Sequence, residues 1–155
     1  MDFVLWASRV MHILSAAVWA GGLIFMNAVL HPVFRHQGAM PSPSSVALQR
    51  RFFPFLWSSL WTMLATGVFM AVLNPRFLGL SVSTLWTQLL AAKVFLFLLI
   101  LFTSWQAARV VRRIEDSLGD AEAAHAWEHT LETLIRRSIA LGILTVLCAG
   151  GMAVA

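Results

Sequence analysis

Four long apolar stretches set the strongest limit on what this chain can fold into. They cover residues 4–30, 53–73, 86–107 and 135–154. An α-helix needs about 20 apolar residues to cross the ~30 Å hydrocarbon core of a bilayer. Because lipid offers no partners to backbone N–H and C=O groups, a spanning segment of this length must be helical. The sequence therefore predicts an all-α, integral membrane four-helix bundle that forms a single domain over residues 1–155.

Composition agrees with a membrane protein and excludes a nucleic-acid partner. Only 12% of the 155 residues are charged and 59% are hydrophobic, whereas soluble domains carry about 25% charged residues. The net charge of +4 comes from arginines at the ends of the apolar stretches, where they meet lipid phosphates. Cys148 is the single cysteine, so no internal disulfide forms.

The distribution of arginine predicts the orientation. The connections after the first and third apolar stretches hold Arg35, Arg50, Arg51, Arg109, Arg112, Arg113, Arg136 and Arg137. The opposite side has Arg76, with Arg9 just inside the first helix. Positive charge is retained on the cytoplasmic side. We therefore expect both termini on the outer, periplasmic side of a bacterial inner (cytoplasmic) membrane.

The connections differ in character. His31–Phe52 holds three prolines among serine and glycine, which predicts an irregular loop. Arg109–Leu134 is charged and rich in alanine and glutamate, so we expect the third helix to continue, turn near Gly119-Asp120, and resume as a helix. Gly21-Gly22 and Gly150-Gly151 indicate close helix packing.

Two ionisable residues, His12 and Lys93, lie deep inside predicted spans, away from the span ends, which makes each a functional hypothesis. Counted from the outer ends of the first and third helices, His12 lies ~12 Å deep and Lys93 ~10 Å deep. Two such residues at the same depth on two helices are expected to line one site from opposite sides. The alternatives are a helix–helix hydrogen bond for His12 and, for Lys93, an amine that reaches the headgroups.

The surroundings of His12 favour a flat ligand. Ser8, Ser15 and Ala16 lie on its helical face and allow close approach. Arg9 and Arg76 are placed to hold carboxylates. A buried imidazole with arginine near the rim is what haem b requires. We therefore predict haem b at His12 and Lys93, with Lys93 as second ligand or charge partner and Arg9 and Arg76 as propionate contacts.

The other histidines leave alternatives open. His31 lies 19 residues beyond His12, about 28 Å along the helix, so the two cannot share one iron. His31 and His36 either form a second metal or haem site or are solvated. His125, Glu128 and His129 match a His-x-x-Glu-His pattern shared with some zinc peptidases, but a solvated helical face remains the alternative.

Four segments resemble CopD-type membrane proteins across nearly the whole chain. They are the His12 segment "HILSAAVWAGG", "RRFFPFLWSSLWTMLATGVF", "LLAAKVFLFLLILF" with Lys93, and "LIRRSIALGILTVL". The related HemJ-type protoporphyrinogen oxidases are similar in having a histidine in helix 1 and a lysine in helix 3. That resemblance implies haem b on His12 with Lys93 in the same site. The Asn-Glu-x-Pro segment expected in their fourth helix is missing here.

Three functions therefore stay open. The first is a b-type haem protein in electron transfer or redox chemistry with an unknown redox partner, which includes a protoporphyrinogen-oxidase-like enzyme. The second is a copper-handling protein of uptake or resistance, as the CopD resemblance implies. Met11, Met26 and Met63 supply soft ligands for copper, but they form no Met-x-x-Met motif. The third is an accessory subunit without cofactor. A homodimer is compatible with all three.

Overall fold

The computed structural model describes residues 2–36, 43–74 and 84–154. Its helices are α1 (Asp2–Phe25), the π-helical segment η1 (Met26–Leu30), α2 (His31–His36), α3 (Pro43–Val72), α5 (Leu85–Asp116) and α6 (Ala121–Val154). Four helical segments of the described chain are long and apolar enough to span a membrane: Phe3–Val33, Pro43–Val72, Leu85–Asp116 and Ala121–Met152. The predicted all-α membrane fold is confirmed.

The irregular loop predicted over His31–Phe52 is wrong for most of its length. The first helix continues through η1 and α2 to His36, and α3 already begins at Pro43. Pro32 inside a regular helix would clash with the carbonyl four residues earlier. The wider π turn, in which the His31 N–H donates to the Met26 carbonyl, relieves that clash and lets the helix continue.

The connection between the third and fourth spans agrees with prediction. Helix α5 continues past its apolar stretch to Asp116, and α6 begins at Ala121. The Asp120 carboxylate accepts a hydrogen bond from the Ala123 N–H at 3.2 Å. An aspartate in this position caps the first turn of a helix, which explains why the chain turns here.

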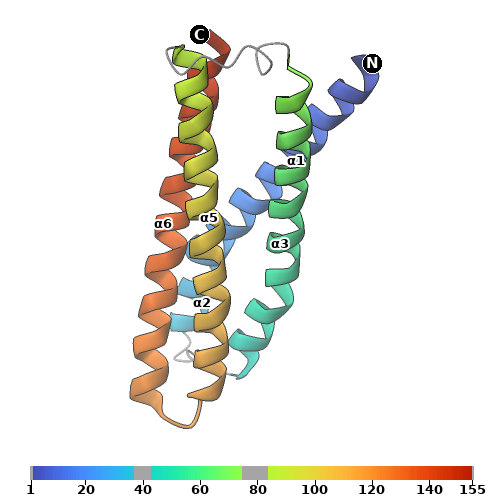
Figure 1. Ribbon diagram of the computed structural model, residues 1–155. Coiled ribbons are helices and arrows are strands. Elements are labelled where there is room, and N and C mark those ends of the chain that lie inside the picture. The colour runs from blue at the N-terminus through green and yellow to red at the C-terminus, as the bar shows by residue number, and fades with distance from the viewer. Residues whose placement is uncertain (1, 37–42, 75–83, 155) are drawn as a thin grey trace.

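The bundle consists of two closely packed helix pairs, α1 with α3 and α5 with α6 (Figure 1). Helix α1 crosses obliquely, while α5 and α6 run side by side. A Cβ atom at Gly22 would lie 2.8 Å from the Phe52 ring of α3, so glycine sets the approach of the first pair. A Cβ at Gly142 of α6 would lie 2.8 Å from the Trp19 ring of α1, so glycine also brings the two pairs together.

Each helix pair also has a hydrogen bond between side chains. His12 of α1 meets Thr66 of α3 at 2.9 Å, and Thr103 of α5 meets Ser138 of α6 at 2.8 Å. Such bonds contribute about 0.6 kcal/mol on average in membrane helix bundles. Both termini lie at one end of the bundle, and the α5–α6 turn lies at the other, as Figure 1 shows. We call the second the arginine-rich end; the membrane side that it faces stays a prediction.

Candidate functional site

The His12 ring is held between α1 and α3. Its Nδ1 atom lies 2.9 Å from the Thr66 hydroxyl oxygen. Its Cε1 atom would lie 3.3 Å from a Cβ atom placed on Gly67. The carbonyl of Met63 also faces the ring as an acceptor. The absence of a side chain at Gly67 thus makes room for the imidazole, and Thr66 fixes its rotation.

The hydrogen bonds of Thr66 determine which nitrogen of His12 carries the proton. The Thr66 hydroxyl donates its proton to the Thr62 carbonyl at 2.6 Å. A hydroxyl has a single proton to donate, so Thr66 Oγ1 accepts from His12 Nδ1–H. In the neutral ring the lone pair is then on Nε2. Metal-binding histidines are typically oriented in this way, with the other ring N–H given to an oxygen acceptor.

Lys93 approaches His12 from another helix. It is half-buried on α5, and its charge lies within electrostatic range of the His12 ring. The thiol of Cys148 on α6 lies within the same range of Lys93. Three helices therefore bring an imidazole, an amine and a thiol toward one region of the bundle. That His12 and Lys93 form one site stays a prediction.

The other residues predicted for this site lie in different environments. Arg9 is exposed on α1. Arg76 lies outside the described residues. Met63, one turn from Thr66 on α3, is 8% exposed, and Met26 is 3% exposed, so both thioethers are in the core. Met11 is exposed and does not share their environment.

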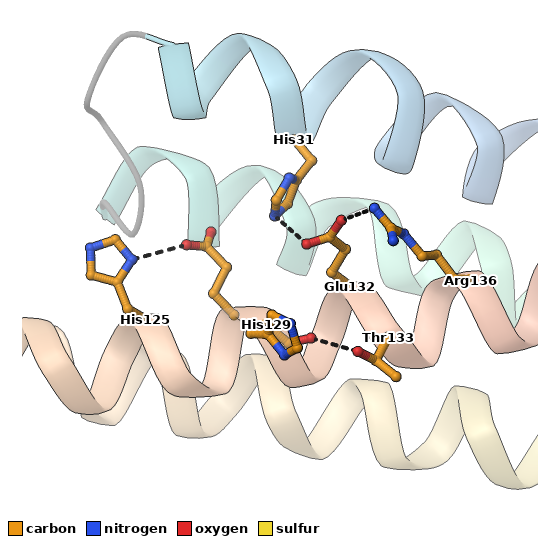
Figure 2. Close-up of polar contacts among 7 residues, drawn as sticks. His31, His125, His129, Glu132, Thr133 and Arg136 are labelled. Atoms are coloured by element: carbon orange, nitrogen blue, oxygen red, sulfur yellow. Dashed lines mark hydrogen bonds and ion pairs between the residues drawn. The ribbon is translucent and has the colours of Figure 1, made fainter.

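A second polar cluster lies at the arginine-rich end, where α2 meets α6 (Figure 2). His31 Nε2 is buried without a hydrogen bond and lies 4.0 Å from a Glu132 oxygen. Arg136 donates to the other oxygen of the same carboxylate. The Arg136 guanidinium therefore already engages the carboxylate that His31 approaches.

The histidines of α6 belong to the same end but point elsewhere. His125 Nδ1 lies 3.7 Å from a Glu128 oxygen. His129 is exposed, and its backbone carbonyl accepts from Thr133 at 3.0 Å. His36 is the last residue of α2, and its side chain lies outside the described residues. The His-x-x-Glu-His pattern thus brings one histidine to Glu128 and leaves the other in contact with the surroundings.

Neither polar region contains the usual group of metal-binding side chains. Within residues 2–36, 43–74 and 84–154, no group of three or more His, Cys, Asp or Glu side chains is placed to hold one ion. A cavity of about 20 Å³ in the bundle is lined by Met26, Ser104 and Ser138, among others, but not by His12 or Lys93. That is room for one water molecule, whereas ligand pockets measure about 300–1,000 Å³.

The fold and its buried polar groups define an integral membrane protein of four spanning helices. A family model described as copper resistance protein D, CopD, matches residues 46–152. The match covers well over half of the chain, so the protein belongs to the copper resistance protein D family. No curated protein and no solved structure matches it significantly. Thr66, Lys93 and Cys148 lie within the matched range, and His12 precedes it.

Sequence reasoning missed Thr66, Gly67 and Cys148 as neighbours of the site. A usable signal existed for the first two. In an antiparallel pair, a residue near the outer end of the first helix faces one near the end of the second. The dipeptide Thr66-Gly67 combines a hydrogen-bonding side chain and an open position there. Cys148 gave no such signal, because nothing in the sequence fixes the rotation of α6.

Proposed function

We propose that the protein handles copper, in uptake or resistance, and binds the ion inside the membrane with His12 as a ligand. The orientation of the His12 ring carries this proposal. Nδ1–H is given to Thr66 at 2.9 Å, so the Nε2 lone pair is the one offered to an ion. Membership of the copper resistance protein D family supports copper as the cargo.

The donors around His12 suit Cu(I). Thioether, thiolate and imidazole groups are the ligands that favour this ion. Met63 lies one turn before Thr66 on α3, and Cys148 lies within electrostatic range of Lys93. We propose that one or both sulfur atoms complete the site with His12. Methionine and cysteine together also explain how a site can exist without three His, Cys, Asp or Glu side chains.

Lys93 acts in this proposal as a charge partner. An ammonium group near His12 disfavours a cation at Nε2 through electrostatic repulsion. A site that must release its cargo benefits from such an opposing charge, because binding that is too tight would stop transfer. In the haem alternative Lys93 is instead the second iron ligand, with Arg9 and Arg76 at the propionates.

The two alternatives predict different contents of the purified protein. Haem b with a redox role, including a haem-dependent oxidoreductase, predicts iron and a Soret band. The accessory subunit without cofactor predicts neither iron nor copper. The family match favours copper over both.

The test is the copper and iron content of detergent-purified protein from cells grown with both metals, followed by Cu(I) titration against a colorimetric chelator. We expect copper without iron, and a large loss of Cu(I) affinity in His12→Ala. His129→Ala is the matched control, because His129 is an exposed histidine in the first turns of α6, next to the α5–α6 turn, whereas His12 lies on α1. Iron with a Soret band, or equal affinities in both variants, would refute the proposal.

A further inference from the structure

A second pocket lies at the arginine-rich end, away from His12. It has a volume of about 650 Å³ and lies between the first turns of α3 and the end of α5. Its charged lining consists of Arg50, Arg51 and Glu115, and its apolar lining includes Phe55 and Leu118. This volume falls within the range of small-molecule sites.

The charges of the pocket favour an anion. Arg50 Nη1 lies 3.2 Å from a Glu115 oxygen. That pair is open to the surroundings, with side-chain exposures of 73% and 43%. Arg51 is exposed and has no carboxylate partner within the described residues. Two guanidinium groups against one carboxylate leave an excess of positive charge, and guanidinium binds phosphate through paired N–H donors.

The apolar wall lies at the right depth for an acyl chain. Phe55 comes four residues after Arg51 on α3, so the two side chains share a helix face. Phe55 lies ~6 Å further along the helix toward the centre of the span, and its side chain is 65% exposed. A phosphate at Arg51 would therefore place the start of an acyl chain against Phe55.

Pro54 lines the same pocket and interrupts the helical hydrogen bonding of α3. Proline has no N–H to donate to the carbonyl four residues earlier, which in α3 is the carbonyl of Arg50. A headgroup hydroxyl can donate to that oxygen. Guanidinium donors, a backbone acceptor and an apolar wall thus occur in the order of phosphate, glycerol and acyl chain in a phospholipid.

We propose that this pocket binds an anionic phospholipid, with its phosphate on Arg51 and Arg50 and an acyl chain along Phe55 and Leu118. Basic pockets between spanning helices are known to select anionic headgroups. The site does not depend on copper binding. It requires only that the arginine-rich end lies at a membrane surface that contains anionic lipid.

The test is native mass spectrometry of the detergent-solubilised full chain titrated with phosphatidylglycerol, and separately with phosphatidylcholine. We expect preferential retention of phosphatidylglycerol, reduced about five-fold in Arg51→Gln, since one arginine near an anionic surface contributes ~1 kcal/mol. Arg137→Gln is the matched control, because Arg137 is an exposed arginine of α6 that does not line the pocket. It should retain the lipid as the unchanged protein does.

Glu115→Gln should change phosphatidylglycerol retention in the opposite direction to Arg51→Gln. It removes the negative charge and releases Arg50 from its ion pair, so phosphatidylglycerol retention should rise. This result remains informative even when Arg51→Gln fails to fold. Equal retention of both lipids, equal losses in the two arginine variants, a decrease in Glu115→Gln, or displacement of the lipid by inorganic phosphate would each overturn the proposal.

Discussion

Replacing Thr66 by valine removes the oxygen that accepts the His12 Nδ1 proton and keeps a branched side chain of similar size. The lost contact is the 2.9 Å bond between α1 and α3. Loss of an oxygen acceptor behind a metal-binding histidine typically costs 10–100-fold in metal affinity, which is about 1.4–2.8 kcal/mol. Because the Met63 carbonyl also faces the ring, we expect the lower end, about ten-fold.

Stability should change less than copper affinity. Single hydrogen bonds between membrane helices contribute about 0.6 kcal/mol and at most about 1.7 kcal/mol, so Thr66→Val should unfold only slightly earlier. The assay is Cu(I) titration against a competing chelator, with a thermal unfolding curve of each sample. Thr66→Ser is the control, because it keeps the hydroxyl and should keep the affinity. Unchanged Cu(I) affinity in Thr66→Val would refute the orientation of His12 that we infer.

Two further substitutions test the packing and the charge of the same region. Gly142→Val should destabilise the bundle by about 1–3 kcal/mol, because a Cβ there would lie 2.8 Å from the Trp19 ring. Gly150→Val is the control and should leave the unfolding temperature unchanged, because a Cβ there meets nothing within 4 Å. Equal effects of the two substitutions would contradict this account of the packing. Lys93→Leu should strengthen Cu(I) binding, because it removes a repelling charge near His12 without adding a donor atom. The same chelator competition measures it, and weaker binding would identify Lys93 as a ligand.

The fold was predictable because the bilayer allows so few solutions. Apolar length and helical hydrogen bonding fixed the four spans, and Asp120 marked the turn between α5 and α6. The failure at His31–Phe52 arose from treating proline as a helix terminator. Helix α3 starts at Pro43, where the missing N–H needs no partner, and a π turn accommodates Pro32.

The sequence predicts the depth of the candidate site residues but not the direction in which their side chains point. Counting residues along α1 and α5 gives His12 and Lys93 the same level in the membrane. Whether two side chains face one another depends on how each helix is turned about its axis. That rotation is set by contacts such as Gly67 against the His12 ring and Gly142 against Trp19. Such contacts pair residues that are distant in the sequence, and a single sequence does not reveal them.

The spacing of residues along the helices places an imidazole in the bundle, but it does not decide between haem and copper. A half-buried imidazole suits either iron or copper. The family match favours copper.

The most direct test of the central claim is X-ray absorption at the copper edge on the Cu(I)-loaded protein and on His12→Ala loaded in the same way. We predict a first coordination shell with sulfur and one imidazole nitrogen in the unchanged protein, and loss of the imidazole signal in His12→Ala. A spectrum that is identical in the two proteins would show that His12 does not bind the copper and would contradict the proposed function.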